Sequence, residues 1–222
     1  MGMEYADILK RLKEYRVSMN MTQEQLSSIT GIGQSKMCKL EKGDLIISYE
    51  FLKILNDMHW NIDYLLVGKK EENTIHVLAD YIKTIPEKRE TKKLICWAME
   101  TYFRQRKIEN VDCDLYLLRA NLDNNNQQTV LFNLRNYLKL NQSVMAEKLG
   151  IRFKKYCSLE KERKEPDAEF LLRIYLLTGC RPGIFFEDNR EDFLVNVLCQ
   201  KIPKEKQKEM IEFVEASNKL FD

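Results

Sequence analysis

Lys and Arg side chains gather in two stretches of this 222-residue chain, where their positive charge could neutralise the phosphates of a nucleic acid. Residues 10–43 hold seven basic and three acidic side chains, and residues 131–164 hold nine basic and three acidic. The formal net charge of the whole chain is only +2, so the other residues are net negative. A solvated mixed-charge surface would not concentrate its positive charge twice in this way. The charge pattern therefore favours a nucleic-acid partner.

Residue types that carry out catalysis or hold metals are sparse. The six Cys form no Cys-x-x-Cys pair and the chain has only two His, so we expect no metal site and reduced, mostly buried thiols. No Gly-x-Ser-x-Gly, P-loop or His-Glu-x-x-His motif occurs, so we expect neither an enzyme nor a bound cofactor. No run of 18 apolar residues occurs, which predicts a soluble intracellular protein without a membrane partner.

An internal repeat contains both basic stretches. Shifting the sequence by 119 positions places residues 12–52 on residues 131–171, with 13 of 41 positions identical. Unrelated segments match at about 1 position in 15 to 20. Each copy is followed by two apolar segments of helical spacing, separated by Ile85-Pro86 in the first copy and by Ile202-Pro203 in the second. We therefore predict a duplicated unit of about 100 residues.

Helical apolar spacing, with only 8 Gly and 4 Pro, predicts an all-α fold. Each copy should form a globular head of short helices followed by a two-helix tail. The predicted organisation is a first head at 5–68, a helical tail at 69–107, a linker at 108–127, a second head at 128–188 and a helical tail at 189–222. Within the linker, residues 112–118 could be a short helix or extended, and the polar run 121–128 indicates the connection itself.

Within the first head, the pattern predicts two short helices joined by a Gly-containing turn. Thr22 is a good N-cap, with Gln25 three residues later as its capping-box partner. Leu26 and Ile29 are expected to face inward before a turn at Gly31, and a third helix follows. The second copy repeats this order 119 residues later. Two short helices joined in this way make the helix-turn-helix motif.

The residues of both heads resemble the lambda-repressor-like (Cro/XRE) helix-turn-helix family. The resemblance is carried by Met-Thr-Gln-Glu-Gln-Leu-Ser at 21–27, by Gly-Ile-Gly-Gln-Ser-Lys-Met-Cys-Lys-Leu-Glu-Lys-Gly at 31–43, and again by 140–151 with Leu-Glu-Lys at 159–161. It covers about 60 residues per copy, at 8–68 and 128–188. It implies two tandem lambda-repressor-like domains in a sequence-specific, double-stranded DNA-binding transcription regulator of the repressor type. It also implies a bacterial or phage cytoplasm, in association with the nucleoid.

The resemblance implies a role for individual side chains in three groups. The residues implied to read bases are Gln34, Ser35, Lys36, Lys39, Phe153, Lys154, Lys155 and Ser158. The residues implied to contact DNA phosphates are Thr22, Gln23, Lys42, Asn141, Gln142, Arg152, Lys161, Arg163 and Lys164. Two structural ion pairs are implied, Arg16 with Glu41 and Arg135 with Glu160.

The second copy departs from the family pattern at three positions. Arg152 stands where a small N-cap residue is usual and offers no side-chain acceptor to the free N–H groups. Phe153 stands in the place of Gln34 and cannot hydrogen-bond a base edge, although it could touch a thymine methyl. Glu162 stands in the place of a Gly. Two hypotheses follow: the second head binds a different half-site, or it binds the DNA backbone only.

Two arrangements and one alternative function stay open. One chain with two heads could act as a covalent pseudo-dimer on a non-palindromic operator, with its tails packed within the chain. Two chains could instead pair through the tails as a homodimer. The alternative function is a protein-interaction module, such as an antitoxin or a repressor antagonist, in which the heads serve as scaffolds.

Overall fold

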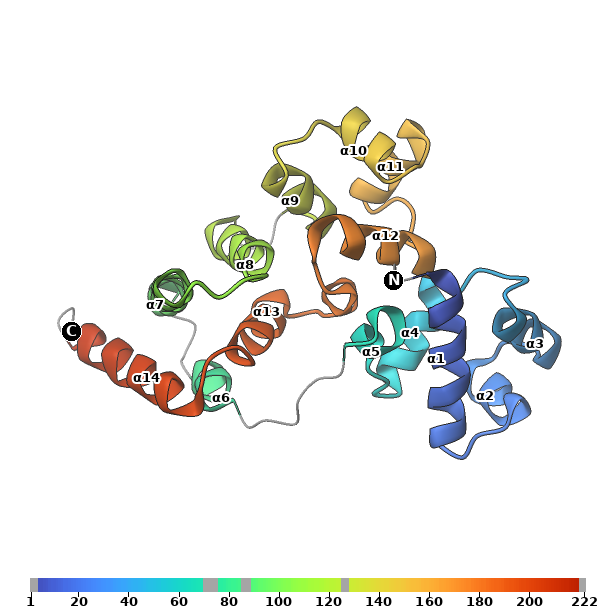
Figure 1. The fold of residues 1–222 in the computed structure, drawn as a ribbon, viewed down its shortest axis with the longest axis horizontal. Helices are drawn as coiled ribbons and strands as arrows, with labels where there is room; N and C mark the ends of the chain where they lie inside the picture. Colours follow the sequence, from blue (N-terminus) through green and yellow to red (C-terminus); the bar gives the residue numbers. More distant parts are fainter. Residues whose placement is uncertain (1–3, 70–75, 85–88, 125–127, 220–222) are drawn as a thin grey trace. The chain divides into compact units, whose positions relative to one another are not determined.

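The computed structural model describes residues 4–69, 76–84, 89–124 and 128–219 (Figure 1). These residues form α-helices, one 3-10 helix and connecting turns, and the described part of the chain has no strand. The predicted all-α class is therefore confirmed. The Ile85-Pro86 element of the repeat and the end of the predicted linker, residues 125–127, lie outside the described residues.

The helices group into two compact units, each built from two stretches of the chain. Unit 1 combines residues 1–71 with 142–186, and unit 2 combines 72–141 with 187–222. The helices of unit 1 are α1 (Tyr5–Ser18), α2 (Gln23–Thr30), α3 (Gln34–Lys42), α4 (Tyr49–Asp57), α5 (Ile62–Val67), α10 (Gln142–Lys148), α11 (Phe153–Glu160), α12 (Ala168–Thr178) and the 3-10 helix η1 (Pro182–Phe185). Those of unit 2 are α6 (Val77–Thr84), α7 (Arg89–Arg106), α8 (Asp112–Asn124), α9 (Val130–Tyr137), α13 (Arg190–Cys199) and α14 (Lys204–Asn218).

This grouping differs from the predicted succession of heads and tails. The helix that opens the predicted second head, α9, belongs to unit 2, whereas α10, α11 and α12 belong to unit 1. Order along the sequence does not decide which helices group together. The grouping follows the apolar surfaces that the helices bury against one another.

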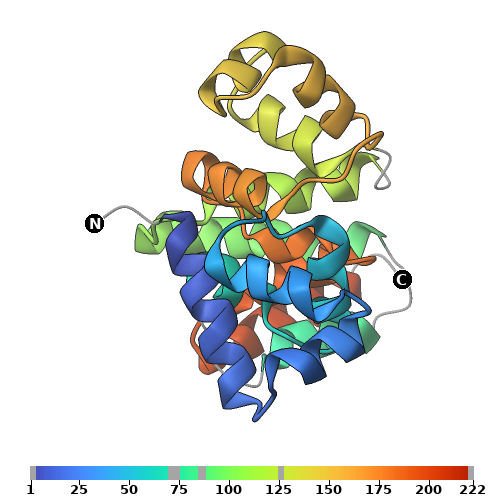
Figure 2. The same ribbon diagram turned by 90° about the vertical axis from the view of Figure 1, so that its right-hand side faces the viewer.

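The first copy forms one core with part of the second. Apolar residues of α1 to α5 pack together, and Ala168, Leu171 and Leu172 of α12 belong to the same buried cluster. The views in Figures 1 and 2 agree that α2 and α3 lie beside α1, which contacts both α3 and α5. The inward position of Ile29 was predicted wrongly, because its side chain is 54% exposed. Thr30 is buried instead, and its hydroxyl donates to the Leu26 carbonyl, so this polar group is satisfied there.

Polar contacts attach the second-copy helices of unit 1 to α4 and α5. The Ala168 N–H donates to the Ile47 carbonyl at 3.0 Å, and the Gly183 N–H donates to Asp63 Oδ1 at 2.7 Å. The Tyr49 hydroxyl donates to the Phe185 carbonyl at 2.7 Å. Each of these hydrogen bonds satisfies a polar group beside the shared core. Together they fix the position of the second-copy helices of unit 1 relative to the first head.

The prediction of a linker at 108–127 is wrong for most of its length, because residues 112–124 form the helix α8. Leu117, Leu118 and Leu122 are buried, and α8 packs against α7, α9 and α13. Asn121, which opens the polar run, is buried as well. The start of α7 is tied to α8, since Arg89 Nε donates to the Leu122 carbonyl. Buried leucines at helical spacing make this segment part of the core of unit 2.

The two predicted tails pack together within one chain, as one of the two open arrangements requires. The first tail corresponds to α6 and α7, and the second to α13 and α14. Within unit 2, α6 contacts both α13 and α14, and α14 also contacts α7. Lys92 of α7 forms an ion pair with Glu191 of α13 at 2.9 Å. The two tails therefore pack against each other, although Trp97 of α7 and Phe213 of α14 stay exposed.

Gln207 of α14 is a buried polar link inside unit 2, so its removal should destabilise the fold. Its amide donates to the carbonyls of Cys199 and Ile202 and accepts from the Leu78 N–H. Gln207→Ala leaves these backbone groups without partners and opens a cavity, so we expect a loss of about 3 kcal/mol in the free energy of unfolding. Urea denaturation measures this loss. The control is Gln105→Ala on the exposed surface of α7, for which we expect a change below about 0.5 kcal/mol; equal effects of the two variants would refute the role of Gln207.

Candidate nucleic-acid interface

The segment that joins α2 to α3 is fixed by local hydrogen bonds. Thr22 caps α2 by accepting from the Gln25 N–H at 3.1 Å, and the Gln25 side chain accepts from the Thr22 N–H at 2.8 Å. The predicted capping box is therefore confirmed. Gly31 ends α2 in the left-handed region with a φ of 68°, and the Ser27 hydroxyl donates to the Ile32 carbonyl. These contacts define the angle at which α3 leaves the turn.

The helix α3 divides into a buried face and an exposed face. Met37 and Leu40 are buried and belong to the core of unit 1. Four polar residues lie on the exposed face: Gln34, Ser35, Lys36 and Lys39. None of these four side chains has a hydrogen bond or ion pair within the part of the chain that the structure describes. Their donors are therefore available to an external partner, and Lys42 extends the exposed positive charge at the end of the helix.

Below this surface, a buried ion pair joins the ends of three helices. Arg16 Nε donates to Glu41 Oε1 at 2.6 Å, and both side chains are less than a tenth exposed. The Gln23 amide donates to Glu41 Oε2 at 2.7 Å, and Arg16 Nη1 donates to the Met21 carbonyl at 2.6 Å. The predicted pair of Arg16 with Glu41 is confirmed. This network links the end of α1, the start of α2 and the end of α3.

The charge state of Glu41 depends on these partners. Burial raises the pKa of the Glu41 carboxyl. The hydrogen bonds from Arg16 and Gln23 and the positive charge of Arg16 together lower it by more, so that the pKa lies below its ordinary value. A carboxyl with a lowered pKa in the folded state stabilises the fold above its unfolded pKa. This stabilisation is lost as the pH falls through the folded pKa.

The predicted phosphate contact of Gln23 acquires a second, structural role from this network. The Gln23 side chain is half-buried and one of its amide hydrogens is directed to Glu41. Sequence reasoning missed this contact, although a signal was present. Gln23 and Glu41 are identical to their counterparts Gln142 and Glu160 in the second copy, and each pair is separated by 18 positions.

Glu41→Gln should destabilise the protein at neutral pH, because it leaves the buried Arg16 guanidinium without a counter-charge. We expect a loss of about 3 kcal/mol in the free energy of unfolding at pH 7. The loss should begin to shrink as the pH falls below the ordinary glutamate pKa of about 4.3, and it should disappear only as the pH falls through the lower pKa of the folded state, where the wild-type carboxylate is itself protonated. The control is Glu14→Gln, because Glu14 pairs with Lys10 on the surface and its loss should cost less than about 1 kcal/mol. Urea denaturation between pH 3 and pH 7 tests this; a loss of constant size at every pH would contradict it.

The second copy repeats the same polar contacts. Gln142 Nε2 donates to Glu160 Oε1 at 2.6 Å, and Arg135 Nη1 donates to the Leu140 carbonyl at 3.0 Å, as Gln23 and Arg16 do in the first. The Tyr156 hydroxyl supplies a further hydrogen bond to Glu160 Oε2 at 2.7 Å. The pairing of Arg135 with Glu160 stays a prediction, because these residues belong to different units.

The exposed face of α11 is more engaged with its own chain than that of α3. The Ser158 hydroxyl donates to the Lys154 carbonyl, and Lys155 Nζ lies 3.4 Å from Asp167 Oδ2. Phe153 is 50% exposed at the start of the helix, and Arg152 gives no side-chain cap, as predicted. Lys154 is exposed and has no such partner within the described residues. Of the four base-reading positions predicted on α11, Phe153 and Lys154 are therefore the two whose side chains are open to an external partner.

The remaining predicted phosphate contacts lie at accessible positions. Side chains are exposed at Thr22, Lys42, Asn141, Arg152, Lys161, Arg163 and Lys164, and Gln142 is half-buried. The structure adds two exposed apolar residues that sequence reasoning missed, Leu45 and Ile46, in the segment after α3. No pattern in the sequence distinguishes them from Ile47, which is buried.

Other site chemistry is limited in the described residues. All six Cys are free thiols, four of them buried, as expected from their spacing. Burial raises the pKa of Cys96 to about 11 and that of Cys199 to about 12, so these thiols stay protonated. Nowhere in the ranges that the structure describes do three His, Cys, Asp or Glu side chains gather as a metal site would require. Among the same residues, no helix is both long and apolar enough to span a bilayer.

Comparison of the chain with protein-family models, with curated proteins and with solved structures finds no match.

Proposed function

We propose that this protein is a sequence-specific, double-stranded DNA-binding transcription regulator of the repressor type. The observation that carries the proposal is the exposed face of α3, where Gln34, Ser35, Lys36 and Lys39 project without internal partners from a helix held by a buried ion pair. A Gln side chain can bind an adenine edge through two hydrogen bonds, and Lys side chains suit guanine or phosphate oxygens. The fixed turn before α3 supplies the rigid positioning that base reading needs.

We further propose that one chain contributes both reading helices, as two tandem lambda-repressor-like heads. Both α3 and α11 belong to unit 1, and α12, which follows α11, shares the core of the first head. Two such helices fit successive major grooves when the half-sites are about 34 Å apart. Because the two exposed faces differ, the operator should be non-palindromic. A homodimer through the helical tails is the second arrangement, but the tails already pack against each other within one chain.

The helix α3 should contribute most of the base specificity. In a selection of bound DNA from a random pool, we expect the full-length protein to enrich one strongly defined half-site and one weakly defined half-site. Gln34→Ala should remove the preference for one base pair at a cost of about 1–3 kcal/mol, because a bidentate contact is lost. Lys154→Ala should instead weaken binding to all sequences and reduce the salt slope by about 1.

The control for both variants is Lys53→Ala, which removes an exposed charge on α4 outside the predicted contact surface. This variant should keep both affinity and preference. Loss of affinity in Lys53→Ala equal to that in Lys154→Ala would indicate non-specific charge attraction. No retention of DNA at low salt would contradict the proposal and favour the protein-interaction module.

Phe153 decides what the second head reads. We expect Phe153→Ala to leave the first half-site unchanged and to lose a thymine preference in the second, because the exposed ring can pack on a thymine methyl. The same random-pool selection measures this. An unchanged preference in both half-sites would show that α11 contacts only the DNA backbone.

A further inference from the structure

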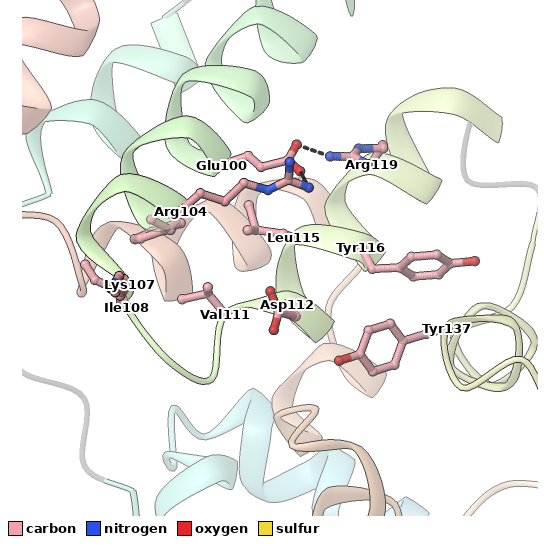
Figure 3. Close-up of a pocket in the computed structure, with 11 residues that line it drawn as sticks. Glu100, Arg104, Lys107, Ile108, Val111, Asp112, Leu115, Tyr116, Arg119 and Tyr137 are labelled. Atoms are coloured by element: carbon pink, nitrogen blue, oxygen red, sulfur yellow. Dashed lines mark hydrogen bonds and ion pairs between the residues drawn. The ribbon is translucent and has the colours of Figure 1, made fainter.

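Unit 2 contains a surface hollow of about 260 Å³ that the predicted DNA contacts do not use. It is formed by the second half of α7, the segment that leads into α8, the first two turns of α8 and Tyr137 of α9 (Figure 3). All of these residues belong to the same unit. The hollow has a charged side, an apolar wall and an aromatic edge, and each constrains the ligand that it could hold.

The charged side is organised by one carboxylate that holds two guanidinium groups. Glu100 is 14% exposed, and its Oε1 lies 2.6 Å from Arg104 Nη2. Its Oε2 accepts from Arg119 Nη2, so that α7 and α8 each supply one cation (Figure 3). Two positive charges share one negative charge. The two guanidinium groups are therefore held in place by Glu100, and the three side chains together keep one net positive charge.

A third cation adds to this excess. Lys107 lines the hollow from just beyond α7, at a φ of 52°, and its ammonium group has no ion-pair partner in the described residues. The only other carboxylate of the lining is that of Asp112, which has no such partner either. The lining therefore has three cations against two carboxylates, which favours a ligand with a negative charge.

The opposite wall is apolar and aromatic. Phe103, Val111 and Leu115 are buried at the base of the hollow. At its edge the rings of Tyr116 and Tyr137 are 5.4 Å apart between centroids and tilted by 51°. Burial raises the pKa of the Tyr137 hydroxyl, and the nearby Cys113, Asp112 and Asp114 raise it further, so this group stays a neutral donor. A wall of this kind accepts a flat apolar body and directs its polar end toward the cations.

We propose that this hollow binds a small organic anion, in which a carboxylate or a phosphate monoester is attached to an apolar body about the size of one ring. The anionic group would be bound by Arg104, Arg119 and Lys107, and the body would pack against the tyrosine rings and the apolar wall. None of these residues belongs to the predicted DNA contacts. The proposal therefore stands independently of the proposed function.

Four probes that share one ring test the proposal with the full-length protein. Benzoate and phenyl phosphate carry the anionic group, benzyl alcohol is neutral and benzylamine is cationic. Saturation-transfer NMR and isothermal titration calorimetry measure their affinities. We expect saturable binding of at least one anion, about tenfold tighter than the neutral and cationic probes, because one charge-assisted hydrogen bond is worth about this factor. The comparison of benzoate with phenyl phosphate distinguishes the two sources of the anion.

Matched variants locate the binding. Arg104→Gln and Lys107→Asn remove two cations of the hollow, and Asn tolerates the left-handed backbone at position 107. The control is Arg106→Gln, which removes an exposed charge of α7 outside the hollow. We expect the double variant to bind the anion at least about tenfold more weakly and Arg106→Gln to bind it within about twofold of wild type.

Three results would overturn the proposal. The first is no saturable binding of either anion. The second is binding of benzylamine as tight as that of the anions. The third is equal weakening by Arg106→Gln and by the double variant. Circular dichroism spectra and urea denaturation check that the double variant remains folded; if it does not, Lys107→Asn alone, which changes an exposed side chain, gives the decisive comparison.

Discussion

The arrangement of the first head depends on one buried negative charge, that of Glu41. Its carboxylate accepts from Arg16 of α1 and Gln23 of α2 while it sits near the end of α3. A charge in this position is costly unless its lone pairs find donors, and the two partners satisfy it only when the three helix ends meet in one geometry. The network therefore acts on orientation as much as on stability. If α3 rotated or shifted, either Arg16 or Gln23 would lose its partner.

The same constraint explains which residues are free. Because Arg16 and Gln23 point inward to Glu41, they add nothing to the outer charge, and the exposed cations of α3 are Lys36, Lys39 and Lys42. Exposed lysines keep their hydration and cost the fold little until a partner displaces that water. Buried polar groups therefore specify the position of α3, and exposed polar groups remain available for recognition. This separation lets the outer residues change without loss of the fold.

The sequence predicted features that depend on local chemistry or on the repeat. The cap at Thr22 and the burial of Leu26 follow from residue type and helical spacing, whereas the pair of Arg16 with Glu41 was implied by the family resemblance. The helix α8 was missed because its polar end, Asn121 to Asn124, resembles a linker, whereas its buried leucines face partners that are distant in the sequence. Periodicity shows that a segment has an apolar face but does not identify what covers it.

Long-range contacts could not be predicted for the same reason. The bond from Gly183 to Asp63 and that from Tyr49 to Phe185 join positions more than 100 residues apart, and no local pattern marks either partner. Nor does spacing distinguish Ile29 from Thr30, since each lies about one turn from Leu26. The hollow of unit 2 is a similar case. Helical spacing alone places Arg104 one turn from Glu100, but only the fold brings Arg119 of the next helix to the same carboxylate.

A comparison of the two copies within the chain shows which parts of the duplicated design tolerate change. The positioning groups are the same in both: Gln23 and Gln142 each donate to a Glu, and Arg16 and Arg135 each donate to the carbonyl five residues later. Most outward positions of the two helices differ, since Phe153, Lys154 and Ser158 replace Gln34, Ser35 and Lys39, whereas Lys36 and Lys155 are identical. One inward difference adds to the network, because the hydroxyl of Tyr156 supplies Glu160 with a further donor that Met37 cannot provide to Glu41. Shared positioning contacts combined with different outer residues are what the proposed recognition of two unlike half-sites would require.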